Sequence, residues 1–159
     1  MSKTRPVIAV DANGGDHGPA VVVPGALAAL PDDGSADFPF EIALYGDESA
    51  IGEQLAKLPS DDLPVTVVSC TQEIDMGEAP ASAIRNKKDS PIVRAMADQK
   101  AGKVQAVVSA GSTGAMVAAS LILLGRLDGV NRPAIGTIIP TVKGRLLLLD
   151  AGANITCTA

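Results

Sequence analysis

The feature that most constrains the fold of this chain is the regular alternation of short apolar segments with longer segments of helical spacing. The apolar segments are rich in β-branched residues, and each has the length of one strand: residues 7–10, 41–45, 65–68, 104–108, 134–139 and 146–149. Their hydrophobicity is nearly continuous, which is typical of strands that are covered on both faces. The pattern therefore predicts a mostly parallel sheet with helices above and below it.

The segments between these runs predict helices: residues 20–30, 50–58, 80–87, 91–100 and 113–124. Ser90 directly precedes Pro91, an order that suits a helix N-cap and the first helical position. Gly102 and Gly125 follow the last apolar turns of two segments and suit helix ends. Together the strands and helices predict an α/β layered fold.

The length of 159 residues suits one domain, because about 150 residues per domain is typical. Hydrophobic residues make up 47% of the chain, which is enough material for a core of that size. We therefore interpret residues 1–159 as a single α/β domain. The last apolar run leads into a turn at residues 150–154, and no helix follows this turn. Because α/β folds close such crossovers, we expect the sequence to be truncated, as the N-terminal part of a longer chain.

Composition and charge exclude several classes of function. Aromatic residues make up 2% of the chain and the net charge is -5, which exclude nucleic acid as a partner. No apolar run approaches the roughly 20 residues that cross a bilayer, and none precedes Asp11 as a leader would. Cys70 and Cys157 form no CxxC pair and have only His17 to join them, so we expect no metal site. We interpret both as reduced thiols of a cytoplasmic protein.

The turn after the first predicted strand, residues 11–17 (DANGGDH), is the first place where chemistry is expected. Gly14 and Gly15 would let the backbone come close to a ligand. The flanking aspartates and His17 could orient this ligand or exchange protons with it. The alternative is a tight turn in which the aspartates accept hydrogen bonds from nearby amides.

A second candidate is the small-residue turn 109–114 (SAGSTG), between a predicted strand and an apolar helix. Small residues leave space, hydroxyl groups donate hydrogen bonds, and exposed amides at a helix N-terminus attract an anion such as phosphate. We interpret this turn as the best anion site in the sequence. The alternative is a turn of small residues that only allows the helix to pack closely on the sheet.

A third candidate is the basic cluster 85–90 (RNKKDS) in an otherwise acidic chain. Its three cations could meet phosphate or an acidic carrier, although a run of charges is more often a solvated face. The turn at 150–154 could add the amide of Asn154 to the same sheet edge, and its alternative is an ordinary glycine turn.

Five motifs together make the sequence recognisable: VDANGGDHGP at 10–19, IRNKKDSP at 84–91, SAGSTGA at 109–115, NRPAI at 131–135 and LLLDAGAN at 147–154. With them, the chain resembles the N-terminal half of the bacterial phosphate acyltransferases of phospholipid synthesis. The resemblance runs from about residue 7 to residue 154. Family chains are about twice as long, which agrees with the expected truncation.

This resemblance implies a Rossmann-like, three-layer α/β/α sandwich related to the phosphotransacetylase and isocitrate dehydrogenase folds. It implies an acyltransferase that makes acyl phosphate from long-chain acyl-acyl carrier protein and inorganic phosphate, without a cofactor. It also implies a cytoplasmic homodimer that touches the membrane peripherally through the missing half. Ser112 departs from the family motif, which usually has Asn there.

The resemblance and the motifs assign three sets of site residues. Phosphate binding is assigned to the small-residue turn: Gly111, Ser112, Thr113 and Gly114. Charge neutralisation and proton transfer are assigned to four catalytic residues: Lys87, Lys88, Asp16 and His17. The remaining wall is assigned to Asp11, Gly14, Gly15 and Asn154.

Two other functions fit the same motifs. One is a phosphotransacetylase-like enzyme that uses acyl-CoA in place of the carrier protein. The other is a truncated, non-catalytic module that binds phosphate or the carrier protein without turnover. Comparing the two thioester donors separates the enzymes, and binding without product formation would indicate the module.

Overall fold

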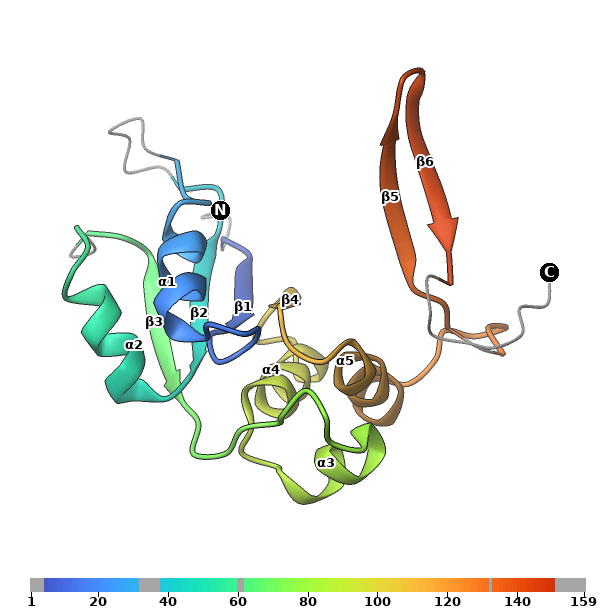
Figure 1. The fold of residues 1–159 in the computed structure, drawn as a ribbon, viewed down its shortest axis with the longest axis horizontal. Coiled ribbons are helices and arrows are strands. Elements are labelled where there is room, and N and C mark those ends of the chain that lie inside the picture. Colours follow the sequence, from blue (N-terminus) through green and yellow to red (C-terminus); the bar gives the residue numbers. More distant parts are fainter. Residues whose placement is uncertain (1–4, 32–37, 60–61, 132, 151–159) are drawn as a thin grey trace. The chain divides into compact units, whose positions relative to one another are not determined.

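The computed structural model describes residues 5–31, 38–59, 62–131 and 133–150. These residues form two compact units that divide after Leu124. The first unit contains a four-stranded sheet with its helices, and the second contains a two-stranded hairpin (Figure 1). The interpretation of residues 1–159 as one domain stays a prediction.

The sheet of the first unit is parallel, with the strand order β3-β2-β1-β4. Its strands are β1 (Val7–Asp11), β2 (Glu41–Gly46), β3 (Val65–Ser69) and β4 (Ala106–Ser109). The register places Asp11 of β1 beside Tyr45 of β2 and Ser109 of β4. The carboxyl ends of these strands therefore meet at one edge, which is where open parallel sheets bind ligands. The predicted α/β fold with a mostly parallel sheet is confirmed.

One face of this sheet is covered by α1 (Pro19–Leu27) and α2 (Glu48–Leu55). Because successive side chains of a strand alternate between faces, Val10, Ile42 and Leu44 all point toward this side. They pack in one buried cluster with residues of the helices and turns: Ala12, Val23, Leu30 and Ile51. Asp47 caps α2 by accepting a hydrogen bond of 2.8 Å from the amide of Ala50.

The opposite face is covered by α4 (Pro91–Lys100). Beside it packs α5 (Thr113–Ala119), and α3 (Pro80–Asn86) packs against α5. Ala9, Ala43 and Tyr45 point to this side and form a buried cluster with Ala95 of α4. The buried residues of the two clusters lie in the sheet, in the helices on both of its faces and in the adjoining turns. The first unit is therefore an α/β/α arrangement of three layers.

The helix ends follow most of the sequence signals. Gly102 and Gly125 have φ of 74° and 88° and follow α4 and the last helical turn of the unit, as predicted. Ser90 is the N-cap residue of α4, but its hydroxyl group donates to the carbonyl of Lys87 at 2.8 Å and does not cap the helix. No described helix is long and apolar enough to cross a membrane.

The predicted helix 113–124 divides into α5 and a π-helical turn, η1 (Ser120–Leu124). At the junction the hydroxyl group of Ser120 donates to the carbonyl of Met116 at 2.8 Å. A side-chain hydrogen bond of this kind shares the carbonyl that regular α-helical pairing uses. The prediction of helix is therefore confirmed in position, with a different helical type in its last turn.

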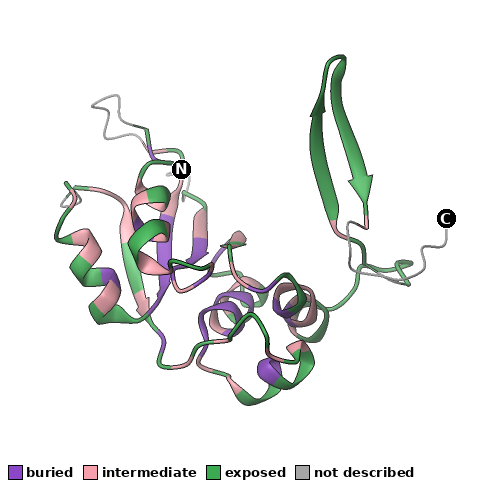
Figure 2. Cartoon of the chain, viewed as in Figure 1, coloured by how far each residue is buried: buried purple, intermediate pink, exposed green. Residues whose placement is uncertain are grey.

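The second unit is an antiparallel hairpin of β5 (Gly136–Thr141) and β6 (Gly144–Leu149). Every residue of both strands is exposed (Figure 2). The prediction that these two runs lie in a covered parallel sheet is therefore wrong. Only residues 142–143 separate the strands, and parallel pairing needs a crossover of about a dozen residues or more. Gly144, with φ of 137°, completes the tight turn that reverses the chain instead.

Candidate active site

Asp11 lies at the centre of the edge where β1 and β4 end. Its side chain is buried, with 3% of the residue exposed. The hydroxyl group of Ser109 donates to Asp11 Oδ2 at 2.7 Å, and the amide of Asn13 donates to Oδ1 at 3.2 Å. Burial raises the pKa of Asp11, while the hydrogen bonds from Ser109 and from the amides of Asn13 and Gly14 oppose this rise. These contacts hold a carboxyl group in one orientation at the ligand-binding edge.

Glycines allow the turns after β1 and β4 to pack backbone against backbone. A Cβ atom added to Gly14 would lie 2.8 Å from the amide nitrogen of Gly111 and 2.9 Å from Asp11 Oδ2. The same amide of Gly111 donates to Ser109 Oγ at 3.0 Å. Gly15 has φ of 84°, a left-handed conformation that other residues rarely adopt. The turn after β4 makes the close backbone approach at Gly14 and Gly15, and their approach to a ligand stays a prediction.

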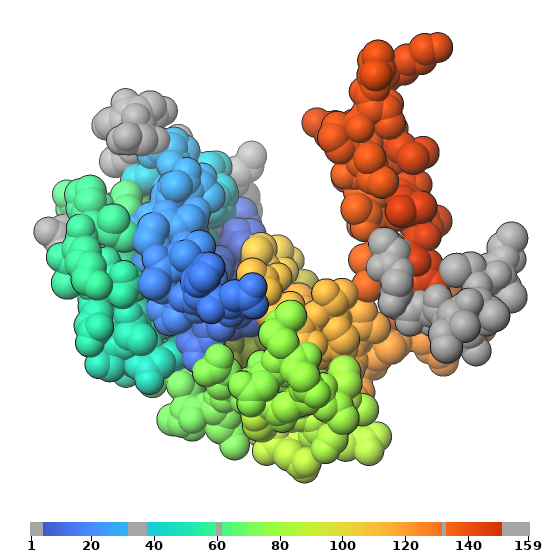
Figure 3. Space-filling model, viewed as in Figure 1, coloured from blue at the N-terminus to red at the C-terminus, as the bar shows by residue number. Residues whose placement is uncertain are grey.

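A cavity of about 180 Å³ opens beside this junction. One side is formed by the turn after β1 and by Gly111, and the other by residues 73–76 and 90–92. The green residues after β3 lie against the blue residues after β1 (Figure 3). Four acidic residues line the cavity: Asp11, Asp16, Glu73 and Asp75. No lysine, arginine or histidine is among the described residues that line it.

The predicted phosphate turn begins at this cavity and runs away from it. Gly111 lines the cavity, whereas Ser112, Thr113 and Gly114 do not. Ser112 is buried, and its Oγ accepts a hydrogen bond of 3.3 Å from the amide of Ala115 as the N-cap of α5. The amides of Thr113 and Gly114 donate to no other residue within the described part of the chain. These two amides are therefore among the donors of the turn that have no acceptor in the described part of the chain.

The two lysines of the basic cluster donate hydrogen bonds to neighbouring groups of the protein. The Lys87 ammonium forms an ion pair with Glu78 and donates to the carbonyl of Glu73 at 2.6 Å. It also holds the pKa of Glu78 below its usual range. Lys88 donates to the carbonyl of Ile84 at 3.0 Å. Neither lysine lines the cavity, although Lys87 contacts a residue that does.

The other predicted site residues are separated by the structure. Asp16 lines the cavity and is exposed. His17 is exposed and is not a lining residue. Asn154 lies outside the described residues. Asp11, Gly14, Gly15 and Asp16 therefore line one cavity, and the proposed proton donor His17 does not reach its lining.

A family model described as fatty acid synthesis protein matches residues 7–159 of the chain. The chain belongs to this family. Its relatives include the phosphate acyltransferase of Oleidesulfovibrio alaskensis, which is 42% identical over 157 residues, 99% of this chain and 44% of the relative. The phosphate acyltransferase of Desulfitobacterium hafniense is 49% identical over 149 residues, 92% of this chain and 42% of the relative. The phosphate acyltransferase of Desulforamulus reducens is 47% identical over 150 residues, which are 94% of this chain and 43% of the relative.

The chain thus spans less than half the length of these members of the fatty acid synthesis protein family. The resemblance to the phosphate acyltransferases is confirmed as a partial match. The site residues inferred from that resemblance stay predictions, because the comparisons assign no role to a residue.

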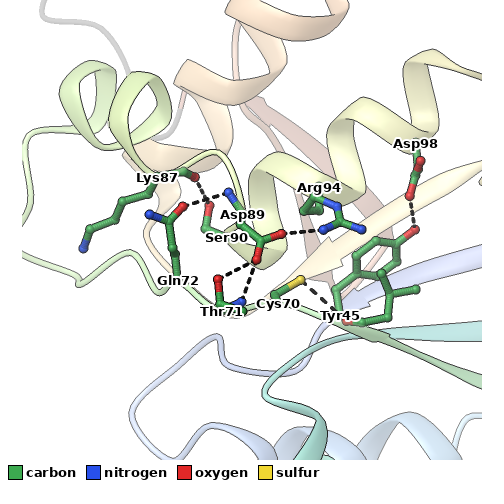
Figure 4. A network of polar contacts seen from close by, with 10 residues as sticks. Tyr45, Cys70, Thr71, Gln72, Lys87, Asp89, Ser90, Arg94 and Asp98 are labelled. Carbon is green, nitrogen blue, oxygen red and sulfur yellow. Dashed lines mark hydrogen bonds and ion pairs between the residues drawn. The ribbon is translucent and has the colours of Figure 1, made fainter.

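The sequence analysis missed the polar network that joins the end of β3 to the turn before α4 (Figure 4). Asp89 is its centre and forms an ion pair with Arg94. The carboxylate also accepts hydrogen bonds from the amide and the hydroxyl group of Thr71, at 2.9 and 2.6 Å. The only sequence signal was an acidic residue before a Ser-Pro helix start, with a cation five residues later. That signal does not identify Thr71, 18 residues earlier in the chain, as the hydrogen-bond partner of Asp89.

The same network surrounds Cys70, the buried thiol at the end of β3. Its Sγ contacts the carbonyl of Val68 at 3.5 Å. Burial raises the pKa of Cys70 to about 11, so its thiol stays protonated near neutral pH. Cys70 is a free thiol, which agrees with the expectation of a reduced cysteine at this position.

Proposed function

We propose that the intact protein forms acyl phosphate from long-chain acyl-acyl carrier protein and inorganic phosphate. The names of the relatives, phosphate acyltransferase, support this reaction class. The single observation that carries the proposal for this chain is the cavity at the carboxyl ends of β1 and β4. Its wall combines Asp11, Gly14 and Gly111, which belong to two of the motifs that carry the resemblance to the phosphate acyltransferases.

In the proposed reaction a phosphate oxygen attacks the thioester carbonyl carbon. A carbon–oxygen bond forms, the carbon–sulfur bond breaks, and the carrier thiolate leaves and takes up a proton. Phosphate is already anionic, so the protein chiefly has to hold it, offset its charge and stabilise the oxyanion. We assign Gly111, Ser112, Thr113 and Gly114 to phosphate, with the open amides of Thr113 and Gly114 as its donors.

The acidic lining makes a cation necessary, because carboxylates and phosphate repel one another. Lys87 is the cation best placed to supply this charge, since its ammonium already contacts the carbonyl of Glu73 at the cavity. In the proposal it exchanges Glu78 for phosphate, and Lys88 assists from the end of α3. His17 protonates the leaving thiolate, with Asp16 beside it in the wall.

The remaining assignments concern partners and location. We propose acyl-acyl carrier protein as the donor, a homodimer as the assembly, and the cytoplasm as the compartment. Peripheral membrane contact is assigned to the part of the family sequence that this chain does not span. The proposed chemistry uses no cofactor.

The test is a chimera that joins this chain to the remaining part of the Desulfitobacterium hafniense relative, with the intact relative as the positive control. Purified protein is incubated with long-chain acyl-acyl carrier protein and phosphate, and acyl phosphate is trapped with hydroxylamine. Phosphate-dependent hydroxamate is the expected result. A clear preference for acyl-CoA would replace the proposal with the phosphotransacetylase-like enzyme. A folded chimera that binds phosphate or the carrier protein without product would indicate the non-catalytic module.

The assignment of Lys87 is tested in the same chimera by Lys87→Ala, with Lys57→Ala as the control. Lys57 is exposed just after the end of α2, and its ammonium group donates to Gln54 Oε1 at 3.4 Å. Removing a cation that balances phosphate should raise the KM for phosphate by about tenfold or more, since 1.4 kcal/mol corresponds to a factor of ten. Lys57→Ala should leave that KM unchanged. An unchanged phosphate dependence in Lys87→Ala would remove Lys87 from the site.

A further inference from the structure

The acidic side of the cavity is a loop whose position is not set by regular structure. Residues 71–78 connect β3 to the residues before α3 without forming a helix or strand. Residues 73–76 of this loop line the cavity. Backbone pairing within a sheet or helix cannot hold such a segment, so its position depends on contacts with its neighbours.

Asp89 supplies most of these contacts at the start of the loop. Its Oδ2 accepts hydrogen bonds from the amide and from the hydroxyl group of Thr71, at 2.9 and 2.6 Å. In return, the amide of Asp89 donates to Gln72 Oε1 at 2.8 Å, and the amide of Gln72 donates to the carbonyl of Asp89 at 3.3 Å. The two segments are therefore joined in both directions by backbone and side-chain groups (Figure 4).

Asp89 is also joined to the helix start that completes the same side of the cavity. Asp89 directly precedes residues 90–92, which line the cavity at the start of α4. Arg94, one turn into α4, forms an ion pair with Asp89 Oδ1. Asp89 itself does not line the cavity. Its carboxylate thus bridges the acidic loop and the helix start from behind the cavity wall.

We propose that Asp89 is a positioning residue of the candidate active site, which holds the loop of residues 71–78 at a fixed distance from the start of α4. The inference rests on the proposed acyltransferase function and deepens it. Asp89 acts through Thr71 and Gln72, which carry the loop into the cavity lining, and through Arg94, which orients its carboxylate. Loss of this bridge leaves the chemical groups present and lets one wall move away from the bound phosphate and acyl donor.

The first test measures the position of the loop directly, by hydrogen exchange on the 159-residue chain. Asp89→Ala is compared with Asp98→Ala, a matched control at an acidic residue of α4, the helix that Asp89 precedes. Asp98 accepts hydrogen bonds from Tyr45 and Lys103, at 2.9 and 2.8 Å, and has no hydrogen bond to the loop. Amides of residues 71–78 should exchange at least tenfold faster in Asp89→Ala alone. Equal exchange in the two variants, or no change in either, would overturn the proposal.

The second test measures catalysis in the chimera with the same two variants. Asp89→Ala should lower kcat/KM by about 10-fold to 100-fold, because small displacements of positioned groups cost rates of that order. Asp89→Asn, which keeps one acceptor oxygen for Thr71, should fall between Asp89→Ala and the parent. Faster loop exchange without any change in kcat or KM would refute the positioning role.

A third variant keeps the test decisive where Asp89→Ala does not fold. Thr71→Val removes one of the two hydrogen bonds to Asp89 Oδ2 and keeps the backbone amide. It should raise the exchange rate of the loop amides and the KM for phosphate, each by a smaller factor than Asp89→Ala does. Unchanged values would contradict the proposal. If the parent chimera makes no acyl phosphate, the proposed function fails, and the exchange comparison still decides whether Asp89 holds the loop.

Discussion

The two sides of the cavity are built in different ways. The side formed by the turns after β1 and β4 is held by a buried carboxyl group and by glycines with no space for a side chain. The side formed by residues 71–78 is held by partly exposed ion pairs and hydrogen bonds around Asp89 and Lys87. One side is fixed by steric contact and desolvation, and the other by polar contacts that solvent can reach.

This difference predicts different responses to change. Steric contacts between backbone segments fail abruptly, because a close-packed interior has no space to absorb an added group. Exposed ion pairs contribute little to stability, since water and salt screen them. Substitutions in the glycine turns should therefore affect folding, whereas substitutions around Asp89 should chiefly affect the position of the loop.

Gly14→Ala should have the largest effect. Its added Cβ would lie 2.8 Å from the amide nitrogen of Gly111, so one of the two turns must shift. We expect the free energy of unfolding to fall by about 2 kcal/mol, as for overpacked interior sites. Gly52→Ala is the control, because its added Cβ would have no described atom within 4 Å apart from its chain neighbours and the backbone of α2. This control should gain about 0.5–1 kcal/mol in urea unfolding, from the higher helix propensity of alanine.

The positions of most strands and of two helix ends were predictable from the sequence, because they depend on local residue patterns. The strands up to β4 and the stops at Gly102 and Gly125 are where the apolar runs and glycines indicate. The apolar runs alone did not predict to which sheet β5 and β6 belong, because such runs indicate strands without indicating their partners. The short connection before Gly144 was the signal for a hairpin.

The candidate site divides in the same way. The chain places Asp11 and Ser109 at strand ends, and the sequence analysis identified both turns. Their contact depends on the pairing of β1 with β4, which brings together residues 98 positions apart. The charge of Lys87 was also visible, but its partner Glu78 became evident only when the loop after β3 was placed.

Asp11→Ala should have the second largest effect. The Ser109 hydroxyl group and the Asn13 amide would lose their acceptors in a buried site, which costs about 1–2 kcal/mol. Asp11→Asn should cost less, because its amide oxygen can accept from Asn13 while its NH₂ group donates to Ser109. Urea unfolding of both variants at neutral pH checks this order, and a larger loss for Asn than for Ala would contradict the hydrogen-bond pattern.

The smallest effect, and the sharpest contrast between the two sides, is expected in the pH dependence of stability. Hydrogen bonds from Thr71, with the nearby Arg94 charge, lower the pKa of Asp89 from 3.8. A lowered carboxyl pKa stabilises the fold above the unfolded value, and this contribution is lost as pH falls through the folded value. Burial raises the pKa of Asp11, so its contribution is complete below 3.8 and is lost as pH rises through the folded value.

The two Asn variants should therefore change stability with opposite slopes between about pH 3 and about pH 7. The difference in free energy of unfolding between the parent chain and Asp89→Asn should shrink as the pH falls below 3.8. Protonation then ends the advantage of the carboxylate over the amide. The parent chain should instead gain on Asp11→Asn as the pH falls from neutral toward 3.8, because protonation relieves the buried charge. Urea unfolding across this range measures both differences. Parallel slopes would mean that the two carboxyl groups share one kind of environment, and the contrast between a desolvated side and a solvent-accessible side would fail.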